Sequence, residues 1–364
     1  MSTKKTKPKS TRPERARPKV TKPRVAERKP VLADLGLQGG GAHGAFTWGV
    51  LDRLLEEPWL SYDGISGTSA GAMNAAVMVD GYAAGGADGA RQALERFWKA
   101  VSDAARLSPF RRGPMEVMTG NWTLDYSPMF MAADVAARVI SPYDIAPHSA
   151  NPLEQILENC IDFERLRRAP IKLFVTATNV RTGRGRLFRN ADVSPDALLA
   201  SACLPTMFQA VEIDGEAYWD GGYSGNPSIA PLIRECSSRD TILVQINPIE
   251  RPGTQRTARE IHNRLNEIAF NSTLIKELRA AALLRRVVDP GTGDGAALAK
   301  MRLHRISSDV MLELGYSSKM LAEWNFFVML RDAGREAAAA FLQGHGEDLG
   351  VRSSLDLDEF LEGV

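Results

Sequence analysis

The sequence predicts an α/β fold, in which helices flank a mainly parallel β-sheet. Two observations support this prediction. Apolar runs of strand length, such as residues 171–179 and 241–246, alternate with segments whose apolar residues recur at helical spacing. The chain of 364 residues, 44% hydrophobic and 24% charged, also has the composition of a globular protein.

Residues 1–30 differ from the rest of the chain in charge. They contain twelve Lys or Arg and two Glu, and prolines recur every five residues from Pro8 to Pro23. Such a segment has little to bury and repels itself, so we expect a disordered basic tail. It acts either as a solubilising leader or as a peripheral contact with an anionic membrane or another polyanion. Each basic side chain near an anionic leaflet is worth about 1 kcal/mol.

The cysteines and the hydropathy pattern limit the cellular setting. Cys160, Cys203 and Cys236 are widely spaced, which argues against a zinc knuckle and a disulfide framework and favours a reducing compartment. No run of about 18 apolar residues predicts a transmembrane helix, and no apolar segment follows the basic N-terminus as in a secretory signal. We therefore expect a cytoplasmic protein, peripheral at a membrane if the tail binds one.

The α/β domain is expected over residues 31–248. Residues 31–37 form a short strand, 38–44 a glycine loop, and 46–55 an amphipathic helix. A second strand leads to Ser69 and a helix follows it. Later elements are a helix near 90–105 within an otherwise irregular region (80–165), a buried strand (171–179), a hairpin (211–219) and a buried strand (241–246).

Residues 249–364 are expected to form a mostly helical extension packed on this domain. Helical patterns cover 257–288 and 317–343, with a glycine-rich loop at 289–295 between them. Three roles stay open for these helices: formation of a homodimer, covering the sheet, and lying against a bilayer. Residues 122–150 serve either as an apolar cover over the site or as an ordinary packed loop.

The segment Gly67-Thr68-Ser69-Ala70-Gly71 matches the nucleophile-elbow pattern of strand, sharp turn and helix. Side chains at 67 or 71 would collide with the backbone of so tight a turn. The turn presents the serine hydroxyl near a helix N-terminus, where N–H groups favour negative charge. Ser69 is therefore the candidate nucleophile.

The glycine loop has two interpretations. Gly39, Gly40 and Gly41 present consecutive N–H groups that suit the oxyanion of a reacting ester, with Ala70 as a further donor. Gly39, Gly41 and Gly44 also match the dinucleotide fingerprint G-x-G-x-x-G, which Asp63 would complete. Because the next strand leads directly to Ser69, the oxyanion interpretation gives one coherent site.

A serine nucleophile also needs a base. The downstream histidines (His148, His262, His304 and His345) do not follow a convincing core strand, and His43 lies inside the glycine loop. Asp220 follows the hairpin and precedes Gly221 and Gly222, so its carboxylate could approach the serine without steric hindrance.

These motifs resemble those of the patatin-like phospholipase family, over roughly residues 31–248. The resemblance rests on residues 39–44, 67–71, 200–205 and 220–222, followed by Asn226-Pro227, in this order. It implies a Ser69–Asp220 dyad without a catalytic histidine, and hydrolysis of (phospho)lipid acyl esters through an acyl-enzyme. It implies no metal or organic cofactor. The family often has Arg or Lys where this chain has His43, a residue that either shapes the loop or contacts a substrate head group.

Two other functions stay open from the sequence. One is a dinucleotide-dependent oxidoreductase that uses the same glycine loop. The other is a non-catalytic protein that binds a lipid or granule surface through residues 1–30 and keeps only a degenerate hydrolase core.

Overall fold

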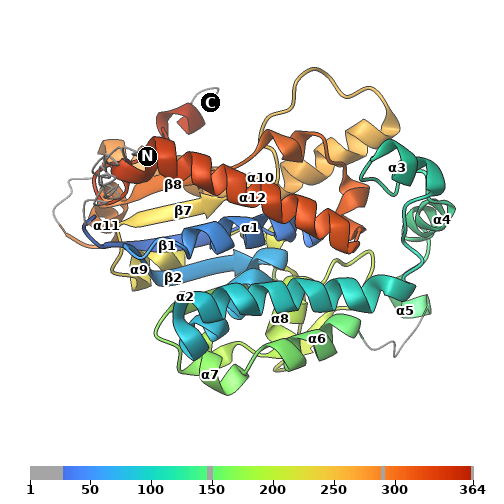
Figure 1. Cartoon of the computed structure of the whole chain (residues 1–364), viewed down its shortest axis with the longest axis horizontal. Helices are drawn as coiled ribbons and strands as arrows, with labels where there is room; N and C mark the ends of the chain where they lie inside the picture. Colours follow the sequence, from blue (N-terminus) through green and yellow to red (C-terminus); the bar gives the residue numbers. More distant parts are fainter. Residues whose placement is uncertain (1–27, 146–150, 288–291, 362–364) are drawn as a thin grey trace, which may run out of the picture.

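The computed structural model describes residues 28–145, 151–287 and 292–361. The expected tail therefore lies almost wholly outside the described residues. Within them, an eight-stranded sheet has the order β5-β6-β3-β2-β1-β7-β8, and β4 pairs with β3. Helices cover both faces of this sheet (Figure 1). The α/β fold expected from the sequence is confirmed.

The central strands are parallel and buried on both faces, as their apolar sequences require. Register pairs Gly36 with both Ser66 of β2 and Leu243 of β7. Ile242 and Val244 contribute to one hydrophobic core and Leu243 to the other, which is the alternation expected of a strand between two helical layers. The parallel strands are β1 (Val31–Leu37), β2 (Leu60–Thr68), β3 (Lys172–Asn179), β7 (Asp240–Val244) and β8 (Arg302–Ile306).

The antiparallel edge contains β4 (Gly185–Arg189), β5 (Val211–Ile213) and β6 (Glu216–Asp220). β5 and β6 form the expected hairpin, whose turn residues Asp214 and Gly215 both have positive φ. β6 pairs with the carboxyl half of β3, where Asp220 lies opposite Ala177. This pairing brings the end of the hairpin beside the centre of the sheet.

One face of the sheet is covered by α1 (Gly44–Leu54), α2 (Ala70–Ala104) and α12 (Trp324–His345). α12 runs closely beside α1 (Figure 1), because Gly49 of α1 and Gly334 of α12 allow the two backbones to touch. α6 (Pro152–Cys160), α7 (Phe163–Arg167) and α8 (Pro195–Ser201) continue this layer. The opposite core lies under α9 (Ala230–Glu235), α10 (Ala258–Val287) and α11 (Asp294–Lys300).

Two expectations about secondary structure need correction. Residues after 249 are mostly helical, but β8 extends the sheet beside β7. The two arginines of β8 made this segment look unlike a buried strand. Arg302 is tolerated there because it pairs with the buried Asp240. Residues 80–165 are more regular than expected. α2 continues to Ala104 with a break at Gly85 and Gly86, and three short helices follow it: α3 (Pro114–Thr119), α4 (Pro128–Ala136) and α5 (Pro142–Ile145).

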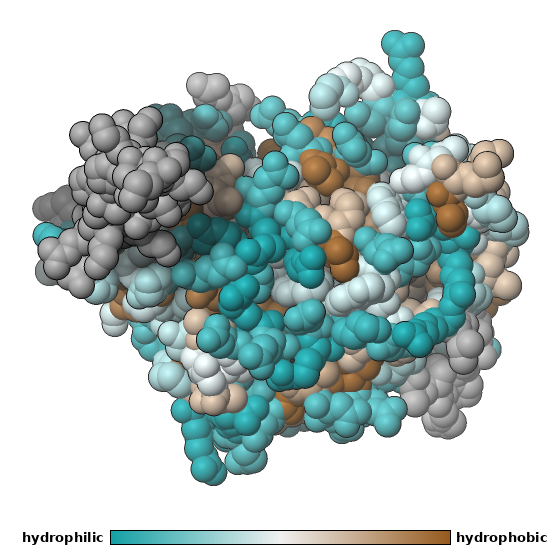
Figure 2. Space-filling model, in the orientation of Figure 1, coloured by the Kyte–Doolittle hydropathy of each residue, from teal (hydrophilic) through white to brown (hydrophobic). Residues whose placement is uncertain are grey.

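The surface combines hydrophilic areas with small apolar ones, as the face drawn in Figure 2 shows. Several large apolar side chains on α3 and α4 are exposed, among them Met118 and Val135. No helix among the described residues is both long and apolar enough to cross a membrane.

Candidate active site

Ser69 lies in the turn between β2 and α2, as the elbow pattern predicts. Its backbone has φ 54° and ψ −124°, a conformation that non-glycine residues rarely adopt. A Cβ at Gly67 would lie 2.6 Å from the carbonyl oxygen of Gly71. A Cβ at Gly71 would overlap the carbonyl oxygen of Leu37. Ser69 donates its N–H to Oγ of Ser201 at 2.9 Å. The turn is therefore held by close backbone packing and by α8.

Asp220 ends β6 and is 1% exposed. Its Oδ1 accepts the N–H of Gly222 at 2.7 Å, whereas its Oδ2 has no hydrogen-bond partner among the described residues. Burial raises the pKa of this carboxyl to about 6, although the Gly222 N–H, the Ser69 hydroxyl and the Lys319 charge each lower it. Ser69 is thus close enough to affect Asp220, and one carboxylate oxygen is free to accept a proton.

Gly221 and Gly222 allow this approach. A Cβ at Gly221 would overlap the carbonyl oxygen of Thr176, and one at Gly222 would lie 2.5 Å from the Phe270 ring. Both glycines are thus required by close contact with neighbouring elements, and the backbone N–H of Gly222 also fixes the carboxylate.

The glycine loop lies directly against the serine. A Cβ at Gly39 would be 2.7 Å from that of Ser69, and Gly41 has φ 58°. Gly39, however, donates its N–H to Oδ1 of Asn226 at 2.7 Å. The Gly39 N–H is therefore not available as an oxyanion donor, which corrects that part of the expected set. Gly40, Gly41 and Ala70 line the cavity beside Ser69, and none of their N–H groups donates to a described side chain.

A buried polar network behind this loop was missed by the sequence analysis. Gln38 Oε1 accepts the N–H groups of Ile246 and Asn247, each at 3.0 Å. Its Nε2 donates to Asn271 Oδ1, also at 3.0 Å. Asn247 in turn donates its Nδ2 to the Gly39 carbonyl at 2.8 Å. Gln38 and Asn247 both follow the carboxyl end of a parallel strand, β1 or β7. Because ligand sites gather at these strand ends, the sequence position of the two amides could have indicated their role.

His43 lies on the other side of the loop and does not line the cavity. It is 3% exposed, and its Nε2 is 2.7 Å from Oγ of Ser318. Burial holds its pKa well below the usual range, with the charges of Lys319 and Arg251 adding to the effect. His43 is therefore neutral and braces the turn η6 (Tyr316–Met320) against the glycine loop.

The other described histidines do not line the cavity either. His304 contacts Asp240 and Ser354, His262 packs against Tyr316, and His345 contacts Asp348. His148 lies outside the described residues. None of the described histidines lines the cavity with Ser69, whereas Asp220 does.

Ser69 and Asp220 open into a cavity of about 270 Å³. Its walls are mainly apolar and come from α2, the loop after α8, α10 and η6; they include Met73, Phe97, Trp98, Met207, Phe208 and Phe270. No described residue of 122–145 lines it; Trp122 packs instead on Phe326, and Phe130 on Phe110. An apolar cavity beside a nucleophile suits a hydrocarbon chain.

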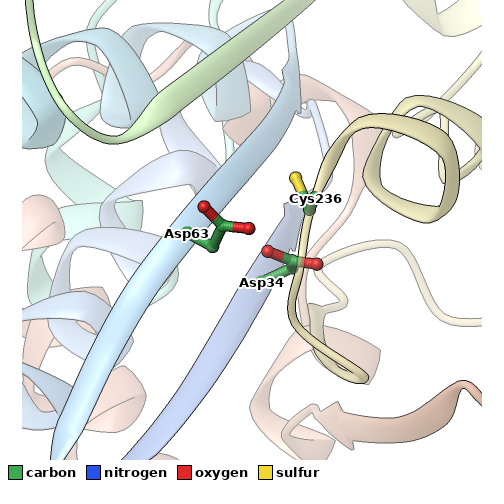
Figure 3. A group of neighbouring side chains, drawn as sticks. All are labelled: Asp34, Asp63 and Cys236. Carbon is green, nitrogen blue, oxygen red and sulfur yellow. The ribbon is translucent and has the colours of Figure 1, made fainter.

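A second group of polar side chains, of which Asp34 is buried and the others partly buried, lies at the sheet away from this cavity. Asp34 of β1, Asp63 of β2 and Cys236 point toward one another (Figure 3), with their ligand atoms within 4.8 Å. Asp34 accepts the N–H of Gly64 at 2.9 Å, and Lys172 is 3.1 Å from Asp63. Burial, then the charge of Asp63, raises the pKa of Asp34 to about 7. The protein itself thus supplies hydrogen bonds and a positive charge to this cluster.

Comparison with known proteins gives a family for the fold. The family model described as patatin-like phospholipase matches residues 35–233. Among solved structures, VipD from Legionella pneumophila is similar with 15% identity and a TM-score of 0.37, over 85% of this chain and 67% of that one. ExoU from the type III secretion system of Pseudomonas aeruginosa, solved in complex with SpcU, is similar with 16% identity and a TM-score of 0.30. That match spans 87% of this chain and 54% of ExoU. No curated protein matches.

Proposed function

We propose, for a chain that belongs to the patatin-like phospholipase family and so to the lipid acyl hydrolases, that Ser69 is the nucleophile and Asp220 its general base. One observation carries this proposal. Two residues that lie far apart in the sequence line the same apolar cavity, and the buried carboxylate keeps one oxygen without a partner among the described residues.

The reaction follows from these positions. Oδ2 of Asp220 accepts the hydroxyl proton as Oγ of Ser69 bonds to the ester carbonyl carbon. The N–H groups of Gly40, Gly41 and Ala70 hold the resulting oxyanion. Collapse breaks the ester bond, and the proton on Asp220 passes to the leaving alcohol. Asp220 then takes a proton from a water molecule as the water oxygen bonds to the acyl carbonyl carbon. Collapse breaks the bond to Oγ and releases the fatty acid, and the proton on Asp220 returns to Oγ of Ser69.

The raised pKa of Asp220 supports its role as the base. A carboxylate with an ordinary pKa near 4 is a weak proton acceptor, whereas one with a pKa of about 6 accepts a proton more readily and is still ionised at neutral pH. The apolar walls exclude water from the acyl chain and strengthen the electrostatic effect of the N–H groups.

The two other functions fit the site less well. A dinucleotide would need the glycine loop free for its pyrophosphate, but Ser69 abuts Gly39, whose N–H is bonded to Asn226. A non-catalytic surface-binding protein would not need the unpartnered oxygen of Asp220. Titration with nicotinamide or flavin cofactors, followed by tryptophan fluorescence, tests the first; labelling with a fluorophosphonate tests the second.

The decisive experiment compares wild type with Ser69→Ala on mixed phospholipid vesicles and on a chromogenic acyl ester. We expect wild type to release fatty acids, detected by mass spectrometry, and to be labelled by a fluorophosphonate. Ser69→Ala should not be labelled, and its turnover should be about 10⁴-fold lower than that of wild type. Ser61→Ala, in the strand β2 that leads to Ser69 and with its hydroxyl bonded to the Val31 carbonyl, should retain both. Full activity of Ser69→Ala would disprove the proposal.

A further inference from the structure

Lys319 places a positive charge at the cavity from outside the region that matches the family model. It belongs to η6, and both Lys319 and its neighbour Met320 line the cavity with Ser69 and Asp220. Its carbonyl group lies so close to Gly41 that a Cβ there would overlap it. η6 is therefore pressed against the glycine loop, and Lys319 is part of the same wall.

The ammonium group of Lys319 is held by neutral partners. Nζ donates to Oδ1 of Asn247 at 2.8 Å and to Oδ1 of Asn266 at 2.7 Å. It also lies 5.4 Å from the centre of the Phe270 ring. Since an ammonium has three N–H groups, one remains for a ligand. The two amides fix the position of the charge without neutralising it.

The nearby acids do not form an ion pair with Lys319 within the described residues. Glu267 is paired with Arg251 and Arg264, and Asp220 bonds to Gly222. Burial lowers the pKa of Lys319 to about 8, while Glu267 and Asp220 raise it and Arg251 lowers it further. Lys319 thus keeps most of its charge at neutral pH, at a desolvation cost that an anion in the cavity would offset.

We propose that Lys319 binds the phosphate of the substrate, so that the cavity selects phospholipids over neutral acyl glycerols. This rests on the proposed function and names a residue outside the family match that would determine the choice of substrate. In a glycerophospholipid the phosphate is only a few bonds from the ester carbonyls, so it would lie close to the residues that line the cavity with Ser69. Lys319 and Asp220 are the charged residues that line this cavity among the described residues. Asp220 repels a phosphate, which leaves Lys319 to bind it.

The charge of Lys319 could instead stabilise the oxyanion of the reacting ester. The experiment distinguishes binding of the substrate phosphate from stabilisation of the oxyanion. Lys319→Met keeps most of the side-chain volume and removes the charge. It is compared with wild type on two short-chain monomeric substrates that carry the same acyl groups, a phosphatidylcholine and a diacylglycerol. Lys99→Met, at an exposed lysine paired with Asp103, is the matched control for a lost charge.

We expect Lys319→Met to lower the ratio of kcat/KM for the phosphatidylcholine to that for the diacylglycerol about tenfold or more. The Lys319 charge also lowers the pKa of Asp220, and its loss changes the base equally for both substrates, so the ratio isolates phosphate binding. Lys319→Arg should retain most of the selectivity, and Lys99→Met should match wild type on both substrates. An equal loss on the two substrates would overturn the proposal, since the charge would then act on the oxyanion or the fold. No loss on either would also overturn it.

A binding measurement tests the same proposal without turnover. In the Ser69→Ala background, Trp98 lies in the cavity wall and its fluorescence reports ligand binding. Lys319→Met should raise Kd about tenfold for the phosphatidylcholine and leave that for the diacylglycerol unchanged. Equal affinities for the phosphatidylcholine with and without Lys319 would overturn this inference. Absence of any ester hydrolysis by wild type would instead contradict the proposed function.

Discussion

Asp220 and Asp34 are both buried carboxyl groups of the sheet, each 1% exposed and each with a raised pKa. They differ in their surroundings. Asp34 accepts the N–H of Gly64, and lies near the Cys236 thiol and beside the Asp63–Lys172 ion pair. Asp220 has one oxygen without a hydrogen-bond partner among the described residues, and it lines the same cavity as Ser69.

The difference shows how to separate a structural carboxyl from a reactive one. A raised pKa is common to both, because both are removed from water. What distinguishes Asp220 is a free acceptor oxygen beside a hydroxyl on a strained turn. Asp34 lines a separate cavity of about 220 Å³, but neither Ser237 nor Ser238, which line it too, lies in a turn with positive φ. Burial alone would have selected either residue as the candidate base. The neighbouring serine hydroxyl distinguishes Asp220.

Replacing each carboxyl by its amide tests this comparison most directly. We expect Asp220→Asn to lower kcat by about 10²–10⁴, because an amide cannot accept the serine proton. Asp34→Asn should stay within about threefold of wild type, since it is remote from the reacting groups. Initial rates on a chromogenic ester measure both. A large loss of activity in a folded Asp34→Asn variant would remove the distinction.

The pH dependence sharpens the same comparison. Asp220 must be ionised to act as a base, and burial raises its pKa to about 6. The value of kcat/KM should therefore be level above this pH and fall about tenfold per unit below it. An exposed carboxylate would show this fall about two units lower.

Asp34 titrates in a similar range, with a pKa of about 7, so its contribution must be removed. Asp34→Asn should give the same acid limb as wild type if Asp220 causes it. Circular dichroism at each pH confirms that the chain stays folded. An activity profile that is flat down to pH 4.5 would rule out a base with the pKa assigned to Asp220.

The smallest expected effect concerns the strain at Ser69. Its φ of 54° suits glycine better than any residue with a Cβ. Ser69→Gly should therefore have a free energy of unfolding about 1 kcal/mol higher than Ser69→Ala, although both variants lack the nucleophile. Denaturant titration measures the difference. Equal stabilities would mean that the turn relaxes and that Ser69 is not held in a strained position.

The sequence was sufficient for features that depend on neighbouring residues. Glycines around Ser69, the Asp214-Gly215 turn and the apolar run of β3 each have a local physical cause. It was insufficient where distant segments decide. The bond from Gly39 to Asn226 spans 187 positions and removes a donor that looked free. The polar strand β8 is stabilised by the pairing of Arg302 with Asp240, and Lys319 reaches the cavity only because α12 and η6 fold back on the glycine loop.

β1 is an interior strand that pairs with β7 on one side, and α1 is packed against α12. A fragment that ends at residue 233, where the family match stops, would thus leave backbone N–H and C=O groups of β1 without their β7 partners. It would also expose the apolar surface of α1 to solvent. Such a fragment would be prone to aggregate on expression. Shortened forms should keep the chain through α12, because β7, β8 and α12 complete the sheet and the helical layer that begin with β1 and α1.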